Sequence, residues 1–458
     1  MSRRRLGIGI GAYAFDKGVV AVIQLLMVPV LANMWGLTLY GIWAMVLTVP
    51  SFLVLGDFGI VNSASARMIR FIARQEWDQA RATLHTAWTV TLAIVAFIAV
   101  VTAAVLLLLP DGTVPTTAGL NEADARLTVL LLLVYGLVGI VFRLNTAAYR
   151  ASMHYTLSIL CSTATYLMEN GVVLVLAFAG FGPVVAAAGM LVVRLLAIGV
   201  VFVLSFRLTP RLRPGFAGTS KAEWREMWRP ALAASALGFG QAAYLQGSVV
   251  LLGAIAGAAS VPAFIAVRTL SRQGVQVATL VSVPVSQEFG NAMGRGELRR
   301  AGRFFGLVFA IAVAMAAVSG AGLVLLGEPF IRLWTHGAIR ADHALLMLMA
   351  LSSIGAMLWS PLSNLVMALN RQNSFSYANL AVSGVGLVVI WMLAGRMGSA
   401  AAGLSFALVD GVTLGAVALF IWRHWAGLGE FRAGASSMMR EMRSPFTMVK
   451  SVLRGAGA

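Results

Sequence analysis

Long apolar segments recur along the whole chain, separated by short polar, glycine-containing or proline-containing breaks. Twelve of these segments reach the ~20 mostly apolar residues that a helix needs to cross a bilayer. They lie at residues 12–34, 38–60, 84–109, 126–149, 155–178, 182–206, 230–254, 261–285, 304–326, 343–368, 375–396 and 400–422. Tight turns separate the closest neighbours, near residues 180–183, 257–260 and 398–399. The pattern predicts an all-α polytopic membrane protein with twelve transmembrane helices.

Composition supports this prediction and excludes a soluble fold. Of the 458 residues, 59% are hydrophobic and only 11% are charged, whereas soluble domains carry about 25% charged residues. The first apolar segment contains Asp16 and Lys17 and lacks an evident cleavage site, so we interpret it as a retained span. The single cysteine, Cys161, excludes an intrachain disulfide. No zinc-type Cys/His spacing and no phosphate-binding loop is present, and the sequence predicts no cofactor.

The positive charges are distributed unevenly between the connecting segments. The formal net charge is +17, from 34 Lys and Arg against 17 Asp and Glu. With twelve spans, 25 of the 34 basic residues fall on the side of the N-terminus and four on the opposite side, the rest lying within spans. Because cytoplasmic loops of membrane proteins are enriched in Lys and Arg, we expect both termini to be cytoplasmic. The same bias explains the net charge without a nucleic-acid partner.

Two short matches indicate an internal repeat. Residues 73–80 and 294–301 both read small-Arg-x-Glu-x-x-x-Ala, and residues 186–189 and 400–403 both read Ala-Ala-Ala-Gly. Six spans per half give both halves the same orientation, so we expect a parallel repeat of two six-helix lobes. The expected organisation is an N-terminal lobe (1–206), a basic cytoplasmic linker (207–229), a C-terminal lobe (230–426) and a cytoplasmic tail (427–458).

The eighth span carries the most informative polar residues. Arg268, Arg272 and Gln276 follow one another at intervals of four and therefore share a helical face. Two arginines one turn apart repel each other unless an anion or water lies near, and the guanidinium fork matches phosphate oxygens. We interpret this face as a cationic cavity wall that binds an anionic headgroup. The alternative is that Arg268 extends to the membrane surface and Arg272 pairs with an acid elsewhere.

Other polar residues within spans are weaker candidates for the same cavity. Gln241 and Tyr244 share a face of the seventh span, which suits sugar hydroxyls but equally suits helix–helix hydrogen bonds. Gln24 is a further candidate in the first span. Asp57, at the cytoplasmic end of the second span, is either a cavity residue or the partner of an interfacial salt bridge.

Ionisable residues in the fifth, sixth and twelfth spans have separate interpretations. Glu169 and Arg194 lie at similar distances from the turn at residue 180, so we predict a structural ion pair between them. Asp410 lies mid-span without an obvious partner. It either binds a coupling proton or cation, or pairs with a basic residue that the sequence does not identify. Asp16 and Lys17 are expected to form a local ion pair.

Three segments resemble a known family. Residues 40–43 (Tyr-Gly-Ile-Trp), residues 56–59 (Gly-Asp-Phe-Gly) and the arginine-rich loop that ends with Glu76 and Ala80 are similar to bacterial polysaccharide-biosynthesis membrane proteins. These are the O-antigen (Wzx-type) flippases of the multidrug/oligosaccharidyl-lipid/polysaccharide exporter superfamily. The resemblance implies a V-shaped pair of six-helix lobes, with spans 1, 2, 7 and 8 lining a central cavity. It also implies residence in the bacterial inner membrane.

The function implied by the resemblance is transport, not catalysis. A flippase of this kind moves an undecaprenyl-pyrophosphate-linked oligosaccharide from the cytoplasmic to the periplasmic leaflet, in cooperation with a polymerase and other polysaccharide-assembly proteins. Arg268 and Arg272 suit the pyrophosphate. The alternatives are a multidrug/cation antiporter of the same fold and a membrane glycosyltransferase or polymerase. The outer loops are too short to form a catalytic domain, which disfavours the enzyme.

Overall fold

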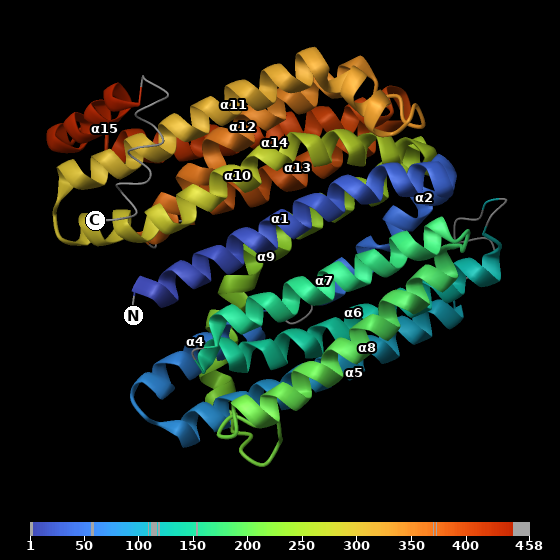
Figure 1. Cartoon of the computed structure of the whole chain (residues 1–458), viewed down its shortest axis with the longest axis horizontal. Coiled ribbons are helices and arrows are strands. Elements are labelled where there is room, and N and C mark those ends of the chain that lie inside the picture. Colours follow the sequence, from blue (N-terminus) through green and yellow to red (C-terminus); the bar gives the residue numbers. More distant parts are fainter. Residues whose placement is uncertain are drawn as a thin grey trace. The chain divides into compact units, whose positions relative to one another are not determined.

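The computed structural model describes residues 3–55, 59–108, 110, 117, 120–152, 154–369, 371 and 373–442 (Figure 1). Across these residues the chain is helical apart from turns, loops and one isolated bridge between Thr117 and Leu120. The predicted all-α polytopic fold is therefore confirmed. Asp57, a candidate cavity residue, lies outside the described residues.

The chain forms two compact units, residues 1–262 and 263–458. The helices of the first unit are α1 (Arg3–Met34), α2 (Gly36–Val46), α3 (Thr48–Leu55), α4 (Ile60–Ala73), α5 (Trp77–Leu108), α6 (Glu122–Ala151), α7 (Tyr155–Phe178), α8 (Pro183–Leu208), α9 (Lys221–Ala256) and the short 3-10 helix η1 (Ala258–Ser260). Helix α9, which the sequence assigned to the C-terminal lobe, here packs against α2, α3, α4 and α5 of the first unit.

The second unit is built from six helices, the first of which begins two residues before the boundary. These are α10 (Val261–Gly294), α11 (Leu298–Trp334), α12 (His343–Ala368), α13 (Asn373–Met397), α14 (Ser399–His424) and α15 (Gly429–Glu441). Helix α12 packs on both α11 and α14, and α13 packs on α14. The aromatic residues Phe289, Trp425 and Phe431 form the centre of one apolar cluster in this unit.

Ten helical segments among the described residues are long and apolar enough to cross a membrane, with α2 and α3 counted as one segment over Gly36–Leu53. Helix α9 contributes a shorter apolar stretch, Gly240–Ala256. Many large apolar side chains on these helices are exposed, among them Val100 (69%) and Leu325 (72%). A surface of this kind is unfavourable in water and favourable in lipid, so the chain is a multi-pass membrane protein. The count of twelve spans and the cytoplasmic location of both termini stay predictions.

The predicted second span is interrupted between α2 and α3. Pro50 has no N–H to donate to the carbonyl of Val46, so the helical hydrogen-bond ladder breaks there. Helix α2 ends at Val46, and Thr48 begins α3 with its hydroxyl bonded to the Met45 carbonyl at 2.6 Å. The break places Leu47, Pro50 and Ser51 at the wall of a cavity that is described below.

A buried histidine fastens the loop between α8 and α9 to helix α5. The Gly218 N–H donates to His85 Nδ1 at 2.9 Å, and His85 Nε2 lies 3.1 Å from the carbonyl oxygen of Arg213. Gly215 and Gly218 pack against the ring so closely that an added Cβ would lie 3.1 and 2.9 Å from its nitrogens. Both ring nitrogens therefore bond the backbone of the predicted basic linker.

The tail contains a helix that the sequence did not predict. Helix α15 packs against α11 through small residues on both helices. A Cβ on Gly302 would lie 2.0 Å from the carbonyl oxygen of Phe431, and a Cβ on Gly434 would lie 2.0 Å from that of Arg299. Arg303 bonds Glu441 at 2.9 Å at the far end of this contact. Residues 429–441 are therefore an integral part of the second unit.

Candidate functional site

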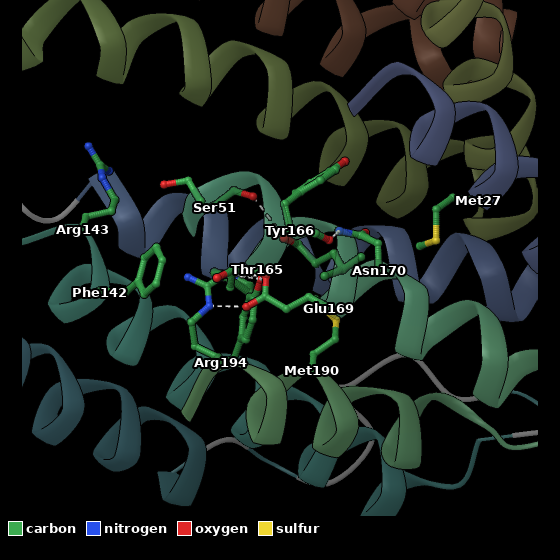
Figure 2. A pocket seen from close by; sticks show the side chains of 14 residues that line it. Met27, Ser51, Phe142, Arg143, Thr165, Tyr166, Glu169, Asn170, Met190 and Arg194 are labelled. Atoms are coloured by element: carbon green, nitrogen blue, oxygen red, sulfur yellow. Dashed lines mark hydrogen bonds and ion pairs between the residues drawn. The ribbon is translucent and has the colours of Figure 1, made fainter. Parts of the chain in front are cut away.

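The first unit contains a polar cavity of about 350 Å³ between its helices (Figure 2). Helices α6, α7 and α8 supply its charged residues, and α1 and α3 complete the wall. The lining residues are Met27, Leu47, Pro50, Ser51, Tyr135, Phe142, Arg143, Ser162, Thr165, Tyr166, Glu169, Asn170, Met190 and Arg194. The cavity therefore combines aromatic rings with hydroxyl, amide and charged groups.

An ion-pair network lies at the centre of this cavity. Arg194 bonds Glu169 through Nε, and through Nη2 at 2.8 Å, while the Tyr135 hydroxyl donates to Glu169 Oε2 at 2.9 Å (Figure 2). The guanidinium also stacks on the Tyr135 ring, 4.4 Å from its centroid. The Glu169 side chain is 2% exposed and that of Arg194 14%. The structure thus brings together the two residues that the sequence placed as a structural pair.

Four further polar residues of the cavity donate hydrogen bonds to the backbone of their own helices. The hydroxyls of Ser51, Ser162 and Thr165 each donate to the carbonyl four residues earlier, at 3.3, 3.0 and 2.8 Å. The Asn170 amide donates in the same way to the Tyr166 carbonyl at 2.8 Å. Their oxygens keep lone pairs that can accept further hydrogen bonds. Arg143 adds a second guanidinium to the wall of the cavity.

The second unit contains a separate network around Asp410 of α14. Arg272 Nη2 lies 2.6 Å from Asp410 Oδ2, and Nη1 lies 3.4 Å from Oδ1. The Ser352 hydroxyl donates to Oδ2 at 2.5 Å, and the Trp359 indole N–H donates to Oδ1 at 2.9 Å. The Asp410 side chain is 4% exposed, which is possible for a carboxylate because Arg272, Ser352 and Trp359 all donate to its oxygens.

This network resolves one of the alternatives that the sequence left open. Arg272 pairs with an acid, and that acid is Asp410, whose own partner the sequence could not identify. Arg272 stays 26% exposed and lies over the Phe406 ring at 5.4 Å. One turn earlier, the half-buried Arg268 lies over the Phe264 ring at 5.0 Å.

The other candidates lie in both units. Gln24 on α1 is half-buried, Gln241 on α9 is exposed and Tyr244 on α9 is buried, all in the first unit. Gln276 on α10 belongs to the second unit and is half-buried, with its amide 3.5 Å from Gln273. At the start of the first span, Asp16 and Lys17 form the local ion pair, at 3.3 Å.

Three residues of the two networks were not candidates from the sequence. Tyr135, Ser352 and Trp359 each bond a buried carboxylate. Uncharged polar residues are common in membrane helices, so hydropathy gives no signal for them. A signal for Tyr135 could have come from its depth, because α6 packs against both helices that carry Glu169 and Arg194.

The family model described as "polysaccharide biosynthesis protein" matches residues 6–288, well over half of the chain. The chain belongs to the polysaccharide biosynthesis protein family. This membership confirms the resemblance drawn from the sequence at the level of the family. No curated protein sequence matches this polysaccharide biosynthesis protein.

Solved structures similar to this polysaccharide biosynthesis protein are transporters of the MOP superfamily. The inward-facing form of a multidrug resistance MATE family transporter has a TM-score of 0.67 and 13% identity, covering 92% of this chain and 99% of its own. The MATE multidrug transporter DinF-BH, solved as a complex, has a TM-score of 0.65 and 14% identity, covering 93% and 96%. At these identities the likeness establishes the fold of the polysaccharide biosynthesis protein and nothing finer.

A third structure differs from these in what is said of its pocket. It is a MOP superfamily transporter from Pyrococcus furiosus, with a TM-score of 0.58, 13% identity and coverage of 92% of this chain and 95% of its own. The binding pocket of that protein is described as having reverse polarity, and this polarity is said to suggest a different function for that protein. The fold thus occurs with more than one pocket polarity.

Proposed function

We propose that this protein is a flippase of the bacterial inner membrane. It moves an undecaprenyl-pyrophosphate-linked oligosaccharide from the cytoplasmic to the periplasmic leaflet by alternating access, for the synthesis of cell-surface polysaccharides such as O-antigen. The observation that carries the proposal is the set of arginine side chains on the helices of the two networks. Arg194 lies in the polar cavity of the first unit, and Arg268 and Arg272 lie on successive turns of α10 in the second unit.

The chemistry of the substrate explains why a membrane protein carries charged groups on these helices. A pyrophosphate and a glycan with many hydroxyls cannot enter hydrocarbon without losing their hydration. Half-exposed guanidinium groups on α10 offer bidentate hydrogen bonds that replace water around phosphate oxygens. Arg268 and Arg272 are therefore assigned to the pyrophosphate, with Gln276 on the same face of the helix. Gln241 and Tyr244 stay candidates from the sequence for contacts with glycan hydroxyls, and Gln24 stays a candidate cavity residue.

The multidrug alternative needs a site that attracts cations. In the described part of the chain, Glu169 and Asp410 are each bonded to an arginine at hydrogen-bond distance. A cationic drug would have to compete with these guanidinium groups for the same carboxylates. The pairing of these two carboxylates therefore favours an anionic substrate over a cationic one. This reasoning, together with family membership, also favours transport over a glycosyltransferase or polymerase activity.

Asp410 has a defined part in this proposal. It neutralises Arg272 when no substrate is present, and it releases the guanidinium when a pyrophosphate arrives. The carboxylate keeps its bonds to Ser352 and Trp359, so it is held in place while its charge is no longer balanced. A group in this position is the natural place for a coupling proton or cation to bind.

The test is charge reversal on α10. Arg268→Glu and Arg272→Glu should abolish surface polysaccharide in cells and abolish translocation of fluorescent undecaprenyl-pyrophosphate-linked sugar in liposomes. Arg332→Glu, an exposed site at the end of α11, is the matched control and should leave both unchanged. Normal polymer output from a correctly inserted Arg268→Glu variant would refute the proposal. Efflux of cationic drugs from cells that lack their native pumps would favour the multidrug alternative.

A further inference from the structure

A second cavity lies at the junction of α11, α14 and α15 in the second unit. It has a volume of about 310 Å³, which corresponds to on the order of ten water molecules. Its wall is formed mainly by apolar side chains, with one arginine and one serine from α15. The lining residues are Phe305, Ile421, Ala426, Phe431, Arg432, Ala435, Ser436 and Met439. We call it the α15 groove.

The α15 groove lies at the level where a membrane-crossing helix ends. Helix α14 qualifies as a span over its whole length and ends at His424, and α15 begins only five residues later at Gly429. Arg423 and His424 occupy the last turn of α14, as basic residues commonly do at the headgroup level. The apolar wall of the groove is therefore next to the acyl region, and α15 is next to the headgroups.

The groove carries a positive charge that the described part of the chain does not neutralise. Arg432 is exposed, and none of the described residues forms an ion pair with it. Glu430, two positions earlier on α15, points to another face of the helix. Glu441 is already bonded to Arg303 and to the Ser437 hydroxyl. Ser436 follows Arg432 by one turn, so a guanidinium and a hydroxyl border the same apolar groove.

The close contact between α11 and α15 fixes the position of two walls of the groove. The helix backbones of α11 and α15 touch at Gly302 and Gly434, where no side chain larger than hydrogen fits. Phe305 and Phe431, both groove residues, also pack against each other with ring centroids 5.4 Å apart. A change in the groove therefore cannot be absorbed by a simple shift of α15.

We propose that the α15 groove is a binding site for an anionic phospholipid of the surrounding bilayer. One acyl chain lies along Phe305, Ile421 and Phe431, and the phosphodiester accepts hydrogen bonds from Arg432 and Ser436. Charge complementarity selects this occupant, because a zwitterionic headgroup would bring its own cation to the exposed guanidinium. The site does not depend on the transport function proposed above and involves none of its residues.

The experiment titrates the purified full-length protein with dioleoyl-phosphatidylglycerol or dioleoyl-phosphatidylcholine and counts bound lipids by native mass spectrometry. Wild-type protein should prefer the anionic lipid, and Arg432→Gln should lower that preference about fivefold, the effect of one basic residue at a membrane surface. Arg332→Gln removes the same charge at the opposite end of α11 and should leave the preference unchanged. Ala426→Phe fills the groove and should lower the binding of both lipids.

Four other results would contradict the proposed lipid site. An unchanged preference in Arg432→Gln, or an equal loss in Arg332→Gln, means that the groove does not select the headgroup. Equal binding of the two lipids by wild-type protein means that an apolar crevice is simply filled. If lipid binding rises when residues 443–458 are deleted, the chain itself competes for the groove. If Ala426→Phe converts a dimer to a monomer without changing lipid binding, the occupant is a second copy.

Discussion

Removing the charge of Glu169 should destabilise the first unit strongly. The carboxylate accepts two hydrogen bonds from Arg194 and one from Tyr135, and its side chain is 2% exposed. Glu169→Gln leaves the Arg194 guanidinium, 14% exposed, without its counter-ion. Breaking a buried ion pair by removing one partner costs about 3–5 kcal/mol. For a unit of this size that free energy corresponds to a fall in melting temperature of about 6–20 °C.

The assay is thermal unfolding of the purified protein in one detergent or lipid mixture. The matched control is Glu122→Gln, which breaks the pair between Glu122 and Arg126 on α6 at 2.9 Å. Both side chains of that pair are about one-third exposed, so the control should cost only about 0.2–1 kcal/mol. The double variant Glu169→Gln with Arg194→Gln buries no charge and should be more stable than Glu169→Gln alone. If Glu169→Gln melts within a degree of the Glu122→Gln control, the buried pair does not stabilise the unit and the reasoning fails.

Three further variants test other contacts. Gly434→Val places a Cβ 2.0 Å from the Arg299 carbonyl oxygen, so α15 should detach from α11 and become sensitive to protease. Unchanged resistance to protease would contradict the close contact between α11 and α15. His85→Ala removes both hydrogen bonds to the linker backbone, which should lower the free energy of unfolding by about 1–3 kcal/mol. Protease should also cleave faster between residues 209 and 220. Equal cleavage rates in the variant and the wild type would be the contrary result. Asp410→Asn removes the carboxylate that competes with the substrate for Arg272. Undecaprenyl pyrophosphate should then bind about tenfold more tightly, which is the low end of the coupling energies of close charge pairs, while translocation slows. Weaker binding would exclude the exchange of Asp410 for pyrophosphate as the partner of Arg272.

Helix limits could be predicted well where a turn signal bounded the apolar run. The predicted segments 155–178 and 343–368 coincide with α7 and α12, because a loop or capping residue stands at each end. Asp342, for instance, accepts a hydrogen bond from the Ala344 N–H as the N-cap of α12. The pairing of Glu169 with Arg194 followed from the same logic, since two consecutive helices joined by a short turn must run antiparallel at matching depths.

Contacts between non-consecutive helices could not be predicted in this way. Arg272 and Asp410 are 138 residues apart on α10 and α14, and no periodicity relates the two helices. The sequence therefore treated Arg272 as an unpaired cation and Asp410 as an unpaired acid. Helix α15 escaped prediction for a different reason. Its many glycine, alanine and serine residues give little hydrophobic signal, although the helix is anchored by close backbone contact with α11 and by the buried side chains of Phe431 and Met438.

The matching helices of the two halves carry charges of opposite sign at neighbouring but not equivalent positions. The repeat that relates residues 186–189 to residues 400–403 places Leu408 opposite Arg194, two residues before Asp410. Helix α8 carries a cation whose partner is on α7, whereas α14 carries an anion whose partner is on α10. If α8 replaced α14 in this register, Leu196 would stand at the position of Asp410, and Arg272 would lose its counter-ion. The matching segments of the two halves are therefore not interchangeable, and either helix can be transplanted only together with its partner.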